Sequence, residues 1–205
     1  KREVLKRMPG GLIEIYSMTE GGVVCLLAAH EFPDKLHTVG RPAPGSELKV
    51  VDDEDREVPP GTPGNMIGRS LTMMSGYKNR PDKTAEAQWI DPATGEAWMR
   101  MGDIGRVDAE GFVELVGRAK DMIISGGENI YPAEIENLAS TWPGVAEAAV
   151  VGLPDARWGE VPVLVLVPLP GALVDVAGLQ ALFQARLARF KHPRRVVQAQ
   201  QVPRT

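Results

Sequence analysis

Three side chains near the start of the chain have the chemistry of a nucleotide site. Tyr16, Thr19 and Glu20 offer a flat ring, a hydroxyl and a carboxylate within five residues, enough for stacking, phosphate contact and Mg²⁺ ligation. They begin at the end of the alternating segment 12–16, an expected short strand, and lie in or beside the polar, glycine-ended segment 17–22. Ligand groups commonly lie at such strand-to-loop junctions. Taken singly, each of the three residues is a weak signal.

Two further positions have the chemistry of a ligand contact. Asp103 follows Gly102 at an expected strand end, where its carboxylate could accept hydrogen bonds from both hydroxyls of a ribose; a turn or capping aspartate is the ordinary alternative. Gly126 and Gly127 interrupt a strand-rich segment, which indicates either a close backbone approach or a plain hairpin turn.

The end of the chain carries a basic stretch without a single acid. On one interpretation its first members complement the negative end of the preceding helix; on the other they meet phosphates, while Phe190 and His192 supply a flat surface for a base. The two interpretations are compatible. The basic residues are Arg186, Arg189, Lys191, Arg194, Arg195 and Arg204.

No metal cage is predicted from side-chain spacing. The acidic run 52–57 lacks the glycine and glutamate positions of a calcium loop, and its place between valines favours a solvated hairpin turn. Cys25, His30 and His37 have ligand chemistry but no recognisable zinc spacing.

The elements that must position these residues fall into two groups. Short strands with Gly and Pro turns between residues 40 and 116 predict a small, strongly bent antiparallel β subdomain with one helix from Pro81 to about Gln88. The expected strands are 47–51, 65–69, 97–100 and 112–116. An N-terminal helix is expected over 1–8.

The pattern changes at residues 117–121. Beyond them we expect a strand pair within 122–131, a helix over 132–141, strands 146–152 and 161–167, a helix over 174–190 and a strand over 195–202. This β-α-β-β-α-β order predicts a second, α+β domain over residues 119–205.

Composition narrows the class of protein. With 43% apolar and 24% charged residues, the chain of 205 residues is an ordinary globular one, and a net charge of −4 argues against a nucleic-acid partner. The lone Cys25 and the absence of a signal-like or membrane-spanning segment favour a reducing, cytoplasmic setting. Because the chain starts without Met and ends without a closing element, we expect a fragment.

Read in order, these features resemble the adenylate-forming superfamily of acyl-CoA synthetases, nonribosomal adenylation domains and luciferases. The order and spacing of the matching segments extend over nearly the whole chain. They are Tyr16-Ser17-Met18-Thr19-Glu20, Gly40-Arg41-Pro42 with Pro44-Gly45, Gly76-Tyr77 with Pro81 and Thr84, Gly102-Asp103, Gly117-Arg118 with Asp121, Gly126-Gly127-Glu128-Asn129, and Pro132 with Glu134-Ile135-Glu136.

The resemblance implies that residues 1–118 are the end of a large N-terminal AMP-binding domain and 119–205 a mobile C-terminal domain, truncated before its end. Such enzymes use ATP and Mg²⁺ to join a carboxylate to AMP, then swing the small domain so that a thiol, such as that of coenzyme A, attacks the adenylate. Asp121 lies at the family's hinge.

The resemblance also assigns roles in the nucleotide site. By position, Tyr16 would stack on adenine, Thr19 would bond the phosphate of AMP and Glu20 would hold Mg²⁺. Asp103 with Arg118 would grip the ribose.

The thiol side of the reaction is assigned in the same way. Gly126 and Gly127 would line the pantetheine tunnel, where a side chain would obstruct the thiol. Trp158, and Phe190 with Lys191, fall where some acyl-CoA ligases hold the CoA nucleotide.

Departures and absences set the remaining expectations. Ser17, Met101 and Lys78 replace a usual Gly, Thr and Trp, and Ser17 puts the identity of the acid in doubt. The family's phosphate loop and its adenylation lysine are expected upstream of Lys1 and just after 203–205. We therefore expect these 205 residues alone to be inactive in adenylation, and acid-dependent ATP–pyrophosphate exchange by them would refute this.

The expected parent is thus an ATP-dependent ligase that joins a fatty or aryl carboxylic acid to CoA. CoA is favoured as the acceptor because segment 125–130 resembles CoA ligases more closely than carrier-protein-dependent domains. The alternatives are an adenylation domain that loads a carrier-protein thiol and a non-catalytic ligand-sensing module. Homo-oligomerisation is left open.

Overall fold

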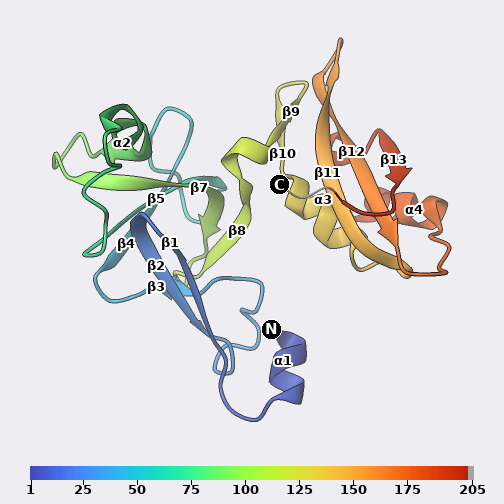
Figure 1. Ribbon diagram of the computed structural model, residues 1–205, viewed down its shortest axis with the longest axis horizontal. Coiled ribbons are helices and arrows are strands. Elements are labelled where there is room, and N and C mark those ends of the chain that lie inside the picture. The colour runs from blue at the N-terminus through green and yellow to red at the C-terminus, as the bar shows by residue number, and fades with distance from the viewer. Residues whose placement is uncertain (203–205) are drawn as a thin grey trace. The chain divides into compact units, whose positions relative to one another are not determined.

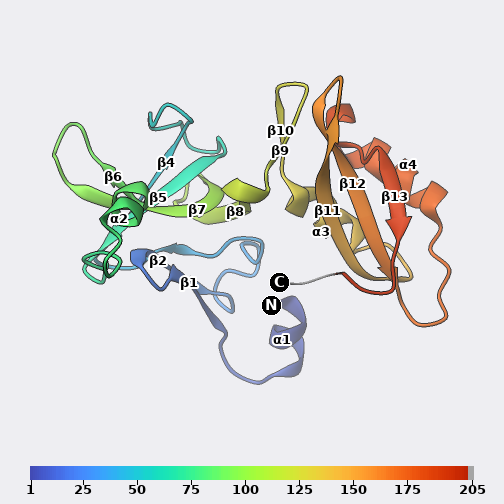
Figure 2. The same cartoon turned by 45° about the horizontal axis from the view of Figure 1, so that its top comes forward.

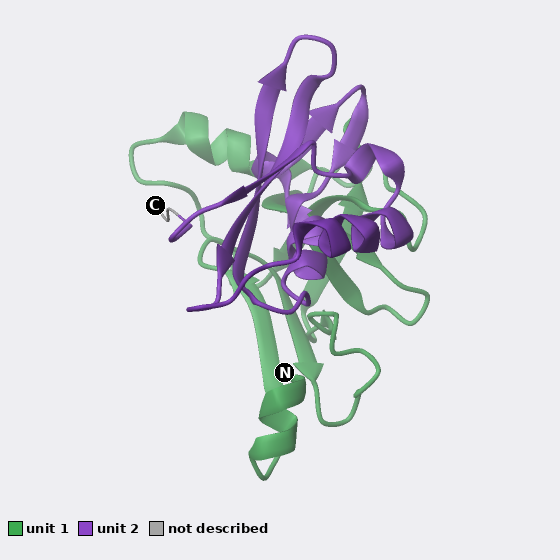
Figure 3. Cartoon of the chain, turned by 90° about the vertical axis from the view of Figure 1, so that its right-hand side faces the viewer, with its two compact units in different colours: residues 1–116 green, residues 117–205 purple. Residues whose placement is uncertain are grey.

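Two sheets build the first of the two compact units into which the chain divides, unit 1 (Lys1–Val116); the second is unit 2 (Gly117–Thr205). The computed structural model describes residues 1–202 (Figure 1), so the predicted basic residue Arg204 lies outside the described residues. Figure 3 colours the two units. Each combines helices with mainly antiparallel strands, and the predicted α+β class is confirmed.

The smaller sheet of unit 1 has the order β1-β2-β3 and follows a short helix, α1 (Arg2–Arg7). Its strands are β1 (Ile13–Met18), β2 (Gly21–Ala28) and β3 (Arg41–Pro42). Strand β2 was not predicted. Residues on both faces of β2 are buried, including the consecutive positions 21–23. The strand therefore lacks the clean alternation of buried and exposed residues that marks a half-exposed strand.

The larger sheet has the order β4-β5-β7-β6, and β8 pairs with β7. Its elements are β4 (Ser46–Val51), β5 (Gly64–Ser70), α2 (Pro81–Ala87), β6 (Gln88–Ile90), β7 (Ala97–Val107) and β8 (Val113–Arg118). The acidic run forms a turn between β4 and β5, in which the Asp52 amide donates to the Arg56 carbonyl at 2.9 Å, as predicted.

The two sheets of unit 1 share an apolar core. Val23 and Cys25 of β2 pack with Met66 of β5, Met101 of β7 and Val113 of β8, all at most 5% exposed. The sheets approach so closely that a Cβ at Gly68 would lie 2.4 Å from the backbone nitrogen of Val23. Burial of this kind is the main stabilising contribution to such a domain, and it fixes the strands that carry Tyr16 and Asp103.

Unit 2 is a sheet with two helices on one side, visible in Figure 3. Its strand order is β10-β9-β12-β11, with β13 parallel to β12. The elements are β9 (Ile123–Ser125), β10 (Glu128–Ile130), α3 (Pro132–Ala139), β11 (Val145–Asp155), β12 (Gly159–Pro168), α4 (Val176–Arg186) and β13 (Arg195–Gln198). Ile135 of α3 and Phe183 of α4 are buried against Leu164 and Leu166 of β12.

The largest differences from the expected bounds in unit 2 lie at the ends of its last helix and last strand. The helix expected to reach Phe190 ends at Arg186, because Leu187 turns to an extended conformation and packs on the core while residues 189–191 form a separate 3₁₀ turn. The strand expected to reach Val202 ends at Gln198, the last residue paired with β12.

Among residues 1–202, no helix combines the length and the apolar character needed to cross a bilayer.

Candidate functional site

Tyr16 and Asp103, which are 87 positions apart, meet in unit 1. The Tyr16 hydroxyl donates a hydrogen bond to Oδ2 of Asp103 at 2.6 Å, and both side chains are half-buried. Hydrogen bonds to an ionised acceptor are short and strong. The bond sets the ring of β1 and the carboxylate of β7 side by side, so two of the residues predicted to contact the nucleotide, Tyr16 and Asp103, lie together.

Asp103 does not lie at a strand end, so that expectation was wrong. Strand β7 continues to Val107, and its register with β5 jumps from Ile67↔Arg100 to Asn65↔Ile104. Gly102 has a φ of +71°, in the left-handed region that favours glycine. The resulting bulge displaces Asp103 from regular pairing, and bulges commonly re-aim a side chain next to an active site.

Thr19 and Glu20 form the tight turn between β1 and β2. Gly21 follows with a φ of +94°, and a Cβ there would lie 2.5 Å from the Cα of Met73. The Met74 amide donates to the Glu20 carbonyl at 2.8 Å. The segment before Tyr77 therefore packs tightly on the turn that carries Glu20.

Tyr77 is the residue whose contribution the sequence did not reveal. Its hydroxyl donates to Oε1 of Glu20 at 2.9 Å. This hydrogen bond is the main reason why the pKa of Tyr77 is raised above its ordinary value of 10.0. The hydroxyl therefore keeps its proton at neutral pH and acts as the donor. The only sequence signal was the Gly76-Tyr77 pair of the motif, to which no role was attached.

The turn of Thr19 and Glu20 offers a single carboxylate to Mg²⁺. Within residues 1–202, no group of three or more His, Cys, Asp or Glu side chains could hold a metal ion. Mg²⁺ is usually held by one or two carboxylates together with substrate phosphates and water rather than by an all-protein cage. The Glu20 carboxylate, in a turn beside the Thr19 hydroxyl, fits that mode of binding.

The residues assigned to the thiol side lie in unit 2, around the hairpin of β9 and β10. Gly126 and Gly127 form its two-residue loop with φ of +62° and +85°, as the hairpin interpretation requires. The Gly126 amide donates to the Trp158 carbonyl at 2.8 Å, and a Cβ at Gly126 would lie 2.7 Å from the Trp158 ring. A Cβ at Gly127 would meet nothing within 4 Å. Figure 2 shows this loop beside the loop that joins β11 to β12.

Trp158 and Phe190 are aromatic rings that remain accessible, at 37% and 41% exposure. The guanidinium groups of Arg157 and Arg194 lie 4.8 and 5.7 Å from the Trp158 ring centre. Beside it is a cleft of about 360 Å³, lined also by Asp155. An exposed ring flanked by cations suits a base and its phosphates.

The remaining predicted residues are Lys191, Arg118 and Asp121. Lys191 forms an ion pair of 2.6 Å with Glu134 of α3, so an anionic ligand would compete for it. Arg118 ends β8, and Asp121 ends a 3₁₀ turn over residues 119–121. Both lie just beyond the boundary between the units at 116–117.

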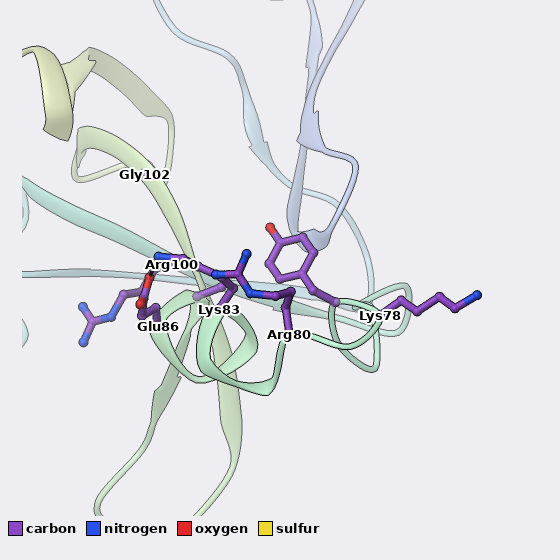
Figure 4. A pocket seen from close by; sticks show the side chains of 8 residues that line it. Lys78, Arg80, Lys83, Glu86, Arg100 and Gly102 are labelled. Atoms are coloured by element: carbon purple, nitrogen blue, oxygen red, sulfur yellow. Dashed lines mark hydrogen bonds and ion pairs between the residues drawn. The ribbon is translucent and has the colours of Figure 1, made fainter.

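A second cleft, of about 570 Å³, lies in unit 1 beside Gly102 (Figure 4). Its lining cations are largely neutralised by acids: Arg80 pairs with Asp82, Arg100 with Asp55, and Lys83 with Glu86. In Figure 4 the Lys78 side chain points away from the others. The cleft therefore has little excess charge with which to attract an anion.

Two family models match the chain. One, described as AMP-binding enzyme, covers residues 1–78, and the other, described as AMP-binding enzyme C-terminal domain, covers residues 134–205.

Three curated relatives are similar along nearly all of the chain. An indoleacetate–CoA ligase from Aromatoleum aromaticum is 44% identical over 100% of this chain, and a feruloyl-CoA synthase from Amycolatopsis is 40% identical over 94%. A fatty acid–[acyl-carrier-protein] ligase, ScoC, from Streptomyces coeruleorubidus is 42% identical over 93%. The chain spans 36–39% of the length of these relatives.

Solved structures agree with the fold. The amide bond synthetase McbA from Marinactinospora thermotolerans matches with a TM-score of 0.87 and 34% identity over 98% of this chain and 40% of that one. The o-succinylbenzoate CoA synthetase MenE from Bacillus subtilis, in complex with an acyl-adenylate, matches with a TM-score of 0.85 and 32% identity over 99% and 40%.

Proposed function

Since the chain belongs to the AMP-binding enzyme family, we propose that the protein is an ATP-dependent carboxylic acid:CoA ligase. The single observation that carries the proposal is the Tyr16–Asp103 hydrogen bond, which sets a ring and a carboxylate together beside the Thr19–Glu20 turn. The relatives named as CoA ligases supply the reaction class.

The first half-reaction uses unit 1 together with Arg118, which lies just beyond it. A carboxylate oxygen of the acid attacks the α-phosphorus of ATP, an acyl–phosphate bond forms, and pyrophosphate leaves. Tyr16 stacks on adenine, Asp103 accepts the ribose hydroxyls and Thr19 donates to the α-phosphate. Glu20 holds Mg²⁺, which supplies charge neutralisation on the phosphates. Arg118 is assigned to the ribose on its place in the Gly117-Arg118 motif.

The second half-reaction uses unit 2. The thiol of coenzyme A loses its proton to solvent, its sulfur attacks the acyl carbon, and AMP leaves as the thioester forms. The Trp158 ring, flanked by arginines, holds the nucleotide of CoA together with Phe190 and Lys191. The loop of Gly126 and Gly127 leaves room for the pantetheine. Asp121 is the hinge whose backbone dihedrals change between the two half-reactions.

A carrier-protein thiol is the second candidate acceptor, because ScoC, a carrier-protein ligase, is nearly as similar as the CoA ligases. Arg157 and Arg194 around Trp158 favour CoA, since a nucleotide with three phosphates uses them and the pantetheine of a carrier protein does not. We place the reaction in the cytoplasm, where the buried Cys25 thiol remains reduced.

The test is a two-stage assay on the natural protein that carries this sequence. Indoleacetate, ferulate and a long-chain fatty acid are each supplied with ATP and Mg²⁺, and pyrophosphate release is measured before CoA or a carrier protein is added. We expect acid-dependent pyrophosphate release, then thioester formation with CoA. Release without a CoA thioester but with a carrier thioester selects the second candidate, and no acid-dependent release with any acid contradicts both.

A further inference from the structure

The motif formed by Gly76, Tyr77 and Thr84 is without a role in the chemistry described so far, yet it touches the site at one point. Tyr77 contacts Glu20, the proposed Mg²⁺ ligand, through a hydrogen bond of 2.9 Å to Oε1. We propose that Tyr77 is a positioning residue that holds the Glu20 carboxylate in its cation-binding orientation. This inference rests on the proposed function.

The Tyr77 backbone is held by the helix that follows it. Its amide donates to Oγ1 of Thr84 at 2.9 Å, and that hydroxyl donates in turn to the Arg80 carbonyl at 3.1 Å. Gly76 precedes it with a φ of +149°, and a Cβ there would lie 3.0 Å from the Thr84 side chain. The spacing of this motif thus lets Thr84 of α2 hold the backbone from which the Tyr77 side chain projects.

The turn that carries Glu20 is held from the same side. The Met74 amide donates to the Glu20 carbonyl, and Gly21 packs against the Met73 backbone. Main chain and side chain of Glu20 are therefore both bonded to the segment 73–77. A glutamate in a turn has three rotatable side-chain bonds, and a donor on Oε1 selects among their rotamers.

Such an outer hydrogen bond has a measurable effect. Partners that orient a metal ligand typically change metal affinity or activity by about 10- to 100-fold when removed. Tyr77 is 40% exposed, so water competes for its hydroxyl. We expect the low end of that range, about tenfold.

The experiment is a double-mutant cycle on the natural protein that carries this chain, with Mn²⁺ as the probe. Mn²⁺ binding in the presence of ATP is measured by electron paramagnetic resonance for Tyr77→Phe, Glu20→Gln and the double variant. We expect Tyr77→Phe to weaken Mn²⁺ binding about tenfold and to add nothing in the Glu20→Gln background. Thr84→Val should shift affinity in the same direction by less, and Thr62→Val, at an exposed turn threonine, should not.

The outcomes separate this inference from the proposed function. Unchanged Mn²⁺ affinity in Tyr77→Phe, or effects of the two substitutions that simply add, overturns the positioning role alone. Unchanged affinity in Glu20→Gln overturns this inference together with the Mg²⁺ role of Glu20, whereas the proposed ligase function fails only if acid-dependent pyrophosphate release is absent. A loss of metal-free AMP binding in Tyr77→Phe shows that the hydroxyl only supports the fold, and it also overturns the inference.

Discussion

The residues proposed for the nucleotide in unit 1 and those proposed for the thiol side in unit 2 have different surroundings. In unit 1, Tyr16 and Glu20 are each bonded to a partner more than fifty positions away, over a buried core. In unit 2, Trp158 and Phe190 keep large exposed faces, and their neighbours are flexible cationic side chains. If the proposed roles hold, this difference predicts that the nucleotide residues are organised before binding to a greater degree than the thiol-side residues.

The largest expected effect tests how well solvent and reagents are excluded from the strand pair that carries Tyr16. Cys25 pairs with Tyr16 across β1 and β2, is fully buried, and burial raises its pKa to about 12 from 9.0. We expect its reaction with a thiol reagent at pH 8 to be about a thousandfold slower than that of a free thiol. Ellman's reagent measures the rate, with the urea-unfolded chain as the control. A native rate near the unfolded one would contradict a pre-organised site.

The next test removes the carboxylate that accepts the hydrogen bond of Tyr16. Asp103→Ala deletes the acceptor of the Tyr16 hydroxyl and the proposed ribose contact, so AMP affinity should fall about 10- to 100-fold. Isothermal titration with AMP measures it. Asp34→Ala, at an exposed aspartate of the same unit, is the matched control. Equal affinities for the two variants would show that Asp103 is a structural aspartate only.

A smaller effect is expected on the thiol side. Trp158→Ala removes an exposed stacking surface, which should raise the KM for CoA about tenfold and leave acid-dependent pyrophosphate release unchanged. Leu173→Ala, at a 98% exposed position of unit 2, is the control. A loss of both half-reactions in Trp158→Ala would contradict the division between the two units.

The smallest effect compares the two glycines of one loop. Both have positive φ, so alanine at either position should cost about 1 kcal/mol of unfolding free energy, and the contact of the new Cβ with Trp158 should add to that cost at Gly126. Only Gly126→Ala also displaces the Trp158 ring, and it should therefore weaken CoA binding more than Gly127→Ala does. Urea unfolding and CoA titration of both variants measure the two quantities. Equal CoA affinities would mean that the Trp158 ring does not need its place on Gly126.

Local pattern predicted much of the fold because its signals are short-ranged. Pro132 at a helix start and two glycines between two strands need no distant partner to act. Long-range pairing explains the failures. Asp103 was placed at a strand end because Gly102 reads as a terminator, whereas β5 keeps the bulged strand in the sheet beyond it.

The sequence by itself determined which residue types could form the proposed site, since the Tyr16–Glu20 segment and the order of the glycine motifs can be recognised from the sequence alone. It also determined the family, which the matches to both family models confirm. Only the tertiary structure decided that the Tyr16 hydroxyl meets Asp103 and that Tyr77 meets Glu20, over separations of 87 and 57 residues. The physical reason is that such contacts depend on strand register and sheet packing, which are set by the whole buried core rather than by any local run of residues.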